Sequence, residues 1–331
     1  MNLFLEKRVY PNHSPVVLYE AMDRKKEHAS LFWLEGCIET TAEDVTYRAV
    51  CEKGRSVLLR QKRPAGPGVA GKQCRDEEER LLEVCRFQAD ILHQADQVVE
   101  KSEEPFCLYR DGEGWYWILY NITSGETLDV ALKERAFSCT IKTLLTLAES
   151  TSRYHKAGWL MLNIRPVGIL VTDHSGIRIT RYLDFDSSIR IADLRSNRKE
   201  TLQIPRMRSA YTAPELLEQI PNLREIGPAA DYYSLGAILF EAVFNRTPDL
   251  YDCIPGIDSV ALIAENTAWE KQTEEIRTQI IAFLTGTLTL SPETRFQSGN
   301  ELTDALKRIA DDCESFPETQ QEKADSVHFE I

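Results

Sequence analysis

Hydrophobic and polar positions alternate in short runs along the first third of the chain. Five of these runs are rich in β-branched and aromatic residues and are bounded by turn residues, at 30–36, 45–52, 55–62, 105–111 and 115–121. Such runs are typical of strands, and the Gly-Glu-Gly turn at 112–114 suits a hairpin between the last two. One further strand-like run, at 16–22, comes before them. We therefore predict a small antiparallel β lobe.

A Pro/Gly-rich linker at 63–72 leads into a segment with helical spacing, from about Gln73 to Phe87. In this segment Leu81, Val84 and Cys85 fall on one face of a helix. The acidic residues 76–79 would lie in its first turns, where negative charge interacts favourably with the helix dipole. The pattern predicts one helix attached to the β lobe.

After Gly125 the spacing of the hydrophobic residues becomes helical. The clearest run has the spacing i, i+3, i+4, i+7, i+8, i+11 and consists of Tyr232, Leu235, Gly236, Leu239, Phe240 and Val243. It predicts a buried helix that begins near Asp231. A second run with helical spacing consists of Leu144, Leu147, Ala148, Thr151 and His155.

Strands first and helices second indicate an α+β chain with two lobes. We expect an N-terminal extension at 1–29, a β lobe with one helix at 30–122, a larger and mainly helical lobe at 123–312, and a polar, disordered tail at 313–331. The 331 residues suffice for a core of this size.

Composition narrows the function classes. The net charge of −13 disfavours general binding to nucleic acid or to anionic membranes. The longest apolar stretch, 236–244, is interrupted by Glu241 and is too short to cross a bilayer. The first ten residues lack the pattern of a secretory signal. The eight cysteines form no CxxC pair, which favours a reducing compartment without structural zinc. We expect a cytoplasmic protein, with delivery into a host cell left open.

Four motifs in a fixed order carry a resemblance to a known family. The first is the frame His155-Lys-Ala-Gly158, continuing as Asn163-Ile-Arg-Pro166 and Ile169-Leu-Val171. The others are Ala213-Pro-Glu-Leu-Leu217, Asp231-Tyr-Tyr-Ser-Leu-Gly236 and Ser291-Pro-Glu-Thr-Arg-Phe296. Together, over about residues 30–310, they resemble the eukaryotic-type Ser/Thr protein kinases, which implies the bilobal fold of that family.

The resemblance implies two structural contacts in the helical lobe. In the family, the glutamate of Ala-Pro-Glu forms a buried ion pair with a downstream arginine, which would be Glu215 with Arg295. Asp231 would accept backbone N–H groups of the catalytic loop and hold its shape. The alternative for Asp231 is an ordinary helix N-cap.

The same resemblance places the catalytic positions on residues that lack the necessary chemistry. Alignment on Arg165-Pro166 puts the His-Arg-Asp motif on Met161, Leu162 and Asn163, so that the general base is replaced by a carboxamide. General-base assistance contributes ~10²–10⁴ in rate. The metal-binding asparagine falls on Gly168, which has no side-chain oxygen. Leu162 replaces the arginine that would meet a phosphorylated activation segment, which argues against control of that type.

The expected nucleotide-binding positions are also altered. The loop at 37–44 has no glycine and carries three acidic residues that would repel phosphates. Arg60 stands at the position of the strand lysine, with Glu78 or Glu79 as its helix partner; the alternative is a surface arginine beside a solvated acidic run. The Asp-Phe-Gly motif falls on Asp184-Phe185-Asp186 or, in another register, on residues 181–183.

The combined sequence reading is a catalytically inactive, protein-kinase-like protein, a pseudokinase that acts as a protein-binding scaffold or allosteric regulator. The alternative is an atypical nucleotide-dependent transferase or a weak Ser/Thr kinase that uses Arg60 and Asp184. We expect no cofactor or metal, and ATP with Mg²⁺ only under the alternative.

The segment from 190 to 208 has a net charge of +4 in this acidic chain. Its basic residues are Arg190, Arg195, Arg198, Lys199, Arg206 and Arg208. Because arginine favours bidentate contacts with carboxylates and phosphates, this basic strip predicts an acidic or phosphorylated protein partner. The alternative is a solvated loop whose charge balances acidic neighbours.

Overall fold

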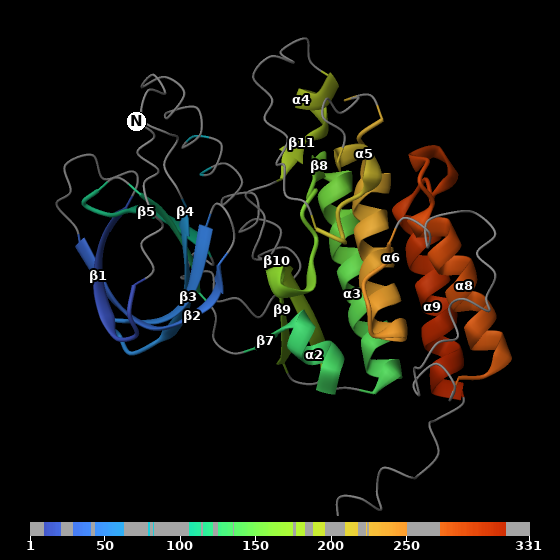
Figure 1. The fold of residues 1–331 in the computed structure, drawn as a ribbon, viewed down its shortest axis with the longest axis horizontal. Helices are drawn as coiled ribbons and strands as arrows, with labels where there is room; N and C mark the ends of the chain where they lie inside the picture. Colours follow the sequence, from blue (N-terminus) through green and yellow to red (C-terminus); the bar gives the residue numbers. More distant parts are fainter. Residues whose placement is uncertain are drawn as a thin grey trace, which may run out of the picture. The chain divides into compact units, whose positions relative to one another are not determined.

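The structure, a computed structural model, divides into two compact units, Met1–Gly125 (unit 1) and Glu126–Ile331 (unit 2), shown in Figure 1. It describes residues 10–20, 29–40, 44–62, 79, 82, 106–113, 115–121, 125–134, 136–174, 177–182, 188–195, 209–217, 223, 225–249 and 272–315. Strands predominate in unit 1 and helices in unit 2, which confirms the predicted α+β chain with two lobes.

Unit 1 is built on a closed antiparallel barrel. Its six strands are β1 (Ser14–Glu20), β2 (Ala29–Thr40), β3 (Asp44–Cys51), β4 (Ser56–Lys62), β5 (Phe106–Arg110) and β6 (Tyr116–Asn121). They follow one another around the barrel in the order β1-β2-β3-β4-β6-β5, and β1 closes it by pairing with β5. All five predicted strands of the β lobe are therefore present.

The separate N-terminal extension predicted at 1–29 is wrong, because β1 belongs to the barrel. Val16 and Leu18 point into the barrel core while the strand pairs with β2 along its length. The sequence showed a strand-like run at 16–22, where the structure has β1 at Ser14–Glu20, but it did not show the partner strands.

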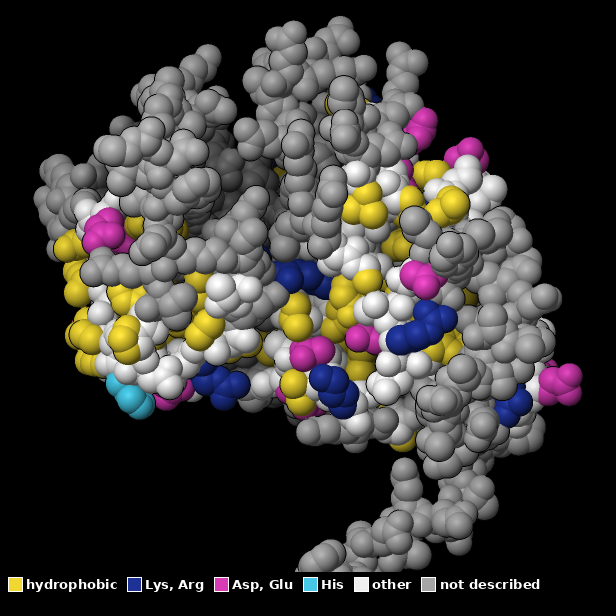
Figure 2. Space-filling model, viewed as in Figure 1, with side chains coloured by type: hydrophobic (Ala, Val, Ile, Leu, Met, Phe, Trp, Pro, Cys, Tyr) yellow, Lys and Arg dark blue, Asp and Glu magenta, His cyan; other side chains and the backbone are white. Residues whose placement is uncertain are grey.

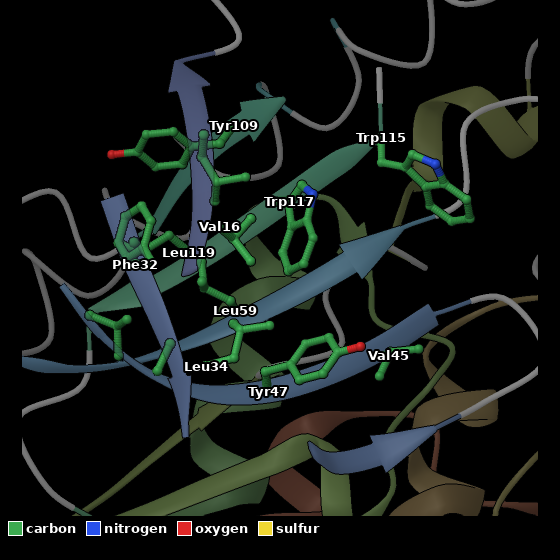
Figure 3. Packing of buried hydrophobic residues seen from close by; sticks show 13 residues of the cluster. Val16, Phe32, Leu34, Val45, Tyr47, Leu59, Tyr109, Trp115, Trp117 and Leu119 are labelled. Carbon is green, nitrogen blue, oxygen red and sulfur yellow. The ribbon is translucent and has the colours of Figure 1, made fainter. Parts of the chain in front are cut away.

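The barrel core is formed by the side chains of each strand that point inward (Figure 3). Trp117 and Tyr47 are fully buried and stack with ring centroids 6.0 Å apart. Asp111, in the β5–β6 turn, accepts the Trp117 indole N–H at 3.0 Å and two turn N–H groups at 2.9 and 3.0 Å. These bonds satisfy the buried carboxylate and fix the hairpin. Of the helix predicted at 73–87, only Glu79 and Leu82 are described, both with helical backbone.

Unit 2 contains most of the helices. They are α2 (Leu128–Glu134), α3 (Phe137–Lys156), α4 (Ile191–Arg195), α5 (Pro214–Leu217), α6 (Pro228–Phe244), α8 (Glu274–Leu288) and α9 (Gly299–Ser315). Short strands accompany them, β7 (Glu126–Thr127), β8 (Trp159–Leu160), β9 (Ile169–His174), β10 (Ile177–Tyr182) and β11 (Ile189–Arg190), with 3-10 turns η1 (Pro166–Gly168) and η3 (Pro292–Thr294). Because α9 continues to Ser315, the tail predicted from residue 313 begins too early; residues 316–331 lie outside the described part.

Helix α6 forms the centre of unit 2 and packs against both α3 and α8 (Figure 1). All six residues of its predicted hydrophobic run are buried. Gly236 allows α8 to approach closely, since a Cβ atom there would lie 2.1 Å from Thr287 Oγ1. The helix begins at Pro228, three residues before the predicted start. This placement puts Asp231 in the first turn of the helix.

Candidate functional site

The loop between β8 and η1 is anchored by a single buried carboxylate. Asp231 is 0% exposed. Its Oδ2 accepts the backbone N–H of Met161 at 2.9 Å, and its Oδ1 accepts that of Leu162 at 2.7 Å. The N-cap of α6 is Gly227, so the alternative assignment of Asp231 as an N-cap is wrong. Asp231 therefore holds the shape of the loop between β8 and η1.

This anchor stabilises a strained backbone. Leu162 has a φ of 57°, in the left-handed region that non-glycine residues rarely occupy. Such a conformation costs of order 1–3 kcal/mol and persists only where surrounding contacts enforce it. The bond from the Leu162 N–H to Asp231 is one such contact. The buried side chains of Met161 and Leu162 add packing where the kinase motif has histidine and arginine.

His155, at the end of α3, adds a third contact to the same carboxylate. Its Nε2 lies 2.7 Å from Asp231 Oδ2, and its ring packs on Tyr232 with centroids 5.4 Å apart. The buried Asp231 thus interacts with a histidine ring and two backbone amides, and links α3, α6 and the loop.

The positions expected to take part in catalysis, Asn163, Arg165 and Gly168, follow the two residues bonded to Asp231. Asn163 and Arg165 are both buried, and Gly168 ends the 3-10 turn η1 with its N–H donated to the Arg165 carbonyl at 2.9 Å. A carboxamide can orient a hydroxyl group but cannot take its proton at neutral pH. Mg²⁺ requires near-octahedral oxygen ligands, and Gly168 offers no side-chain oxygen. The described residues of this loop do not fit the base and metal set that phosphoryl transfer uses.

The candidate nucleotide-site residues of unit 1 are only partly described. Arg60, on β4, is 1% exposed and lies between Thr46 of β3 and Ile118 of β6. The alternative of a surface arginine is therefore wrong, because the strand directs this side chain into a covered face. Glu79 is exposed, whereas Glu78 lies outside the described residues. The predicted loop 37–44 is shorter, since β2 extends to Thr40 and β3 starts at Asp44.

The Asp-Phe-Gly position follows β10. In the earlier register, residues 181 and 182 are paired with β9, opposite Leu170 and Ile169. Tyr182 is buried and hydrogen-bonded to Thr151, and its pKa is raised, chiefly by burial. That register therefore places a core tyrosine within the motif. Asp184, from the later register, lies outside the described residues.

Glu215 and Arg295, 80 positions apart, form a buried ion pair in unit 2. Two parallel bonds of 2.8 Å join the guanidinium Nη1 and Nη2 to Oε1 and Oε2. The remaining N–H groups of Arg295 donate to the carbonyls of Thr289, Ala229 and Leu290 at 2.8–3.1 Å. All five donors of the arginine are thus used, a set that lysine cannot reproduce.

Tyr211 and Glu241 are a second link that the sequence analysis missed. The Tyr211 hydroxyl donates to Glu241 Oε2 at 2.5 Å, and Ser234 donates to the Tyr211 carbonyl at 2.8 Å. Burial, followed by the hydrogen bond to Glu241, raises the pKa of Tyr211 well above its usual range. The phenol therefore stays protonated as a donor. The sequence offers one signal for this link, the position of Tyr211 two residues before the Ala213-Pro214-Glu215 motif.

Of the basic strip, only Arg190 and Arg195 are described. Both are exposed. The Arg190 guanidinium stacks on Trp159 at 5.3 Å from the ring centroid. The other four basic residues, Arg198, Lys199, Arg206 and Arg208, lie outside the described residues. The segment is anchored before and after this gap by β11 pairing with β8 and by Tyr211 with Glu241.

The described part of the chain holds neither a metal-ligand cluster nor a membrane-spanning helix. No group of three or more His, Cys, Asp or Glu residues there is arranged to hold a metal ion. None of the helices described is both long and apolar enough to cross a membrane.

In sequence, the chain is similar to serine/threonine-protein kinases. The chain is 28% identical over 200 residues to a probable serine/threonine-protein kinase of Clostridium acetobutylicum, covering 58% of this chain and 28% of that protein. It is 27% identical over 205 residues to the serine/threonine-protein kinase PknA of Mycobacterium tuberculosis, covering 60% and 44%. The chain thus spans less than half the length of these two relatives.

Solved structures share the fold at low identity. The PknI kinase domain of M. tuberculosis matches with a TM-score of 0.53 at 15% identity, over 84% of this chain and 96% of that domain. ROP2 of Toxoplasma gondii, described as a virulence factor with a protein-kinase fold and no enzymatic activity, matches with a TM-score of 0.58 at 16% identity, over 92% and 86%.

A family model gives the assignment directly. The model of the protein kinase domain matches residues 90–307, about two thirds of the sequence. This match includes the anchored loop, the Glu215–Arg295 pair and the central helix α6. The chain therefore belongs to the protein kinase domain family.

Proposed function

We propose that this chain is a catalytically inactive member of its family, a pseudokinase that acts by binding other proteins as a scaffold or allosteric regulator. The observation that carries the proposal is Asn163 at the base position of a loop that Asp231 still anchors. Gly168, at the metal-ligand position, adds a second and independent loss.

The hydrogen bonds of Asp231 support this placement of the motif. They reach the N–H groups of Met161 and Leu162, which are the residues that precede Asn163. A shift of the alignment by one residue would separate the anchor from the first two motif positions. Loss of general-base assistance alone is worth ~10²–10⁴ in rate. ROP2, which is reported to have a protein-kinase fold and no enzymatic activity, is a precedent for this fold without catalysis.

The alternative is an atypical nucleotide-dependent transferase or a weak Ser/Thr kinase. The relatives found by sequence are named serine/threonine kinases, which favours it. Arg60, which is buried at the strand position, is the cation that this alternative would use. This alternative needs Arg60 and Asp184 to hold a nucleotide and its metal.

Phosphotransfer is expected to be absent. With labelled ATP, Mg²⁺ or Mn²⁺ and generic protein substrates, incorporation should equal that of a control variant carrying Asn163→Ala and Asp184→Ala. Millimolar Mg-ATP should leave the melting temperature unchanged, whereas a ligand at 100 times its Kd would add ~2.7 kcal/mol. Incorporation above the control, or a thermal shift that Arg60→Ala removes, would establish the alternative.

We further propose that the basic strip binds an acidic or phosphorylated protein. Arg190, stacked on Trp159, is exposed, and so is Arg195 five positions further along the chain. Charges at the rim of an interface set chiefly the association rate and its salt dependence. Binding through this strip should therefore weaken steeply as salt increases.

Charge reversal tests the strip. The triple variant Arg195→Glu, Arg198→Glu, Arg206→Glu should keep the wild-type melting temperature and lose binding to an acidic phosphopeptide by at least about tenfold. A matched control reverses three exposed basic residues elsewhere in unit 2, Lys133, Lys156 and Arg308. If both triple variants lose binding equally, the effect is one of net charge, and the strip is not the binding surface.

A further inference from the structure

We draw no further inference here: the strongest candidate, the patch of hydrophobic side chains on the outer surface of the barrel in unit 1 (Figure 2), where Val17 and Trp33 are 45% and 39% exposed, carries nothing, because the described residues do not show what covers it.

Discussion

Arg295→Ala is expected to lower the free energy of unfolding by about 3–5 kcal/mol, the usual cost of removing one partner of a buried ion pair. The side chains of Arg295 and Glu215 are 0% and 4% exposed, so Glu215 would be left as a buried charge without its partner. Three backbone carbonyls would lose their donor in addition. Urea unfolding, monitored by tryptophan fluorescence, measures the loss.

Variants of the same pair separate the contribution of charge from that of geometry. Glu215→Ala should destabilise by a similar amount, and the double variant by clearly less than the two single effects added together. Arg295→Lys should remain destabilising, because three donors cannot replace five. If Arg295→Lys were as stable as the wild type, the hydrogen bonds to the carbonyls would contribute little.

An exposed ion pair of the same protein is the matched control. Lys142 and Glu314 approach to 2.7 Å, with side chains 49% and 60% exposed. Solvent and salt screen such a pair, and its removal typically costs less than 1 kcal/mol. Lys142→Ala should therefore leave the unfolding midpoint nearly unchanged. Equal losses of stability at the two sites would contradict the importance of burial for the Glu215–Arg295 pair.

The elements with a clear period were predictable from the sequence. The alternation in β2, β3 and β4 and the i, i+3, i+4 run in α6 follow from which faces must be buried. The first and last residues of these elements were harder to predict. Helix α6 starts at Pro228 because proline fits the first turn, where its missing N–H is not needed. Hydrophobic spacing carries no signal for such polar first turns.

Contacts between distant segments were predictable only where a motif pairs them. Glu215 and Arg295 were linked by the family resemblance and do form the pair. The bond from Tyr211 to Glu241, over 30 positions, had no comparable signal, since neither residue type suggests the other. The pairing of β1 with β5 was likewise unpredictable, because the sequence of a seven-residue strand does not specify its second neighbour.

The chemical character of the loop could be inferred from residue types alone, whereas its shape could not. In any alignment that includes Arg165-Pro166, Asn163 falls at the position of the general base and Gly168 at that of the metal-binding asparagine. The loss of both groups can therefore be read from the sequence. The positive φ of Leu162 and the three donors gathered on Asp231 required coordinates. Strain of this kind arises from tertiary contacts, and a leucine in the sequence gives no hint of it.

Asp231→Ala is expected to destabilise unit 2 by about 3–5 kcal/mol and to release the loop. It removes the acceptor of two backbone N–H groups and the histidine partner inside the core, and each buried donor left unsatisfied costs ~1–3 kcal/mol. Leu162 would lose a contact that holds its left-handed conformation. Hydrogen exchange at residues 158–168, read by mass spectrometry, should accelerate well beyond the change in global stability.

The neighbouring His155→Ala variant distinguishes loop anchoring from general stabilisation of the core. It removes one of the three contacts of Asp231 and leaves both backbone bonds in place. We expect a loss of about 1–2 kcal/mol, with exchange at Met161 and Leu162 close to that of the wild type. Asp231→Asn keeps a single acceptor oxygen and should fall between the two. If exchange of the Leu162 amide were unchanged in Asp231→Ala, the carboxylate would serve helix α6 alone, and the loop would owe its shape to the packing of Met161 and Leu162.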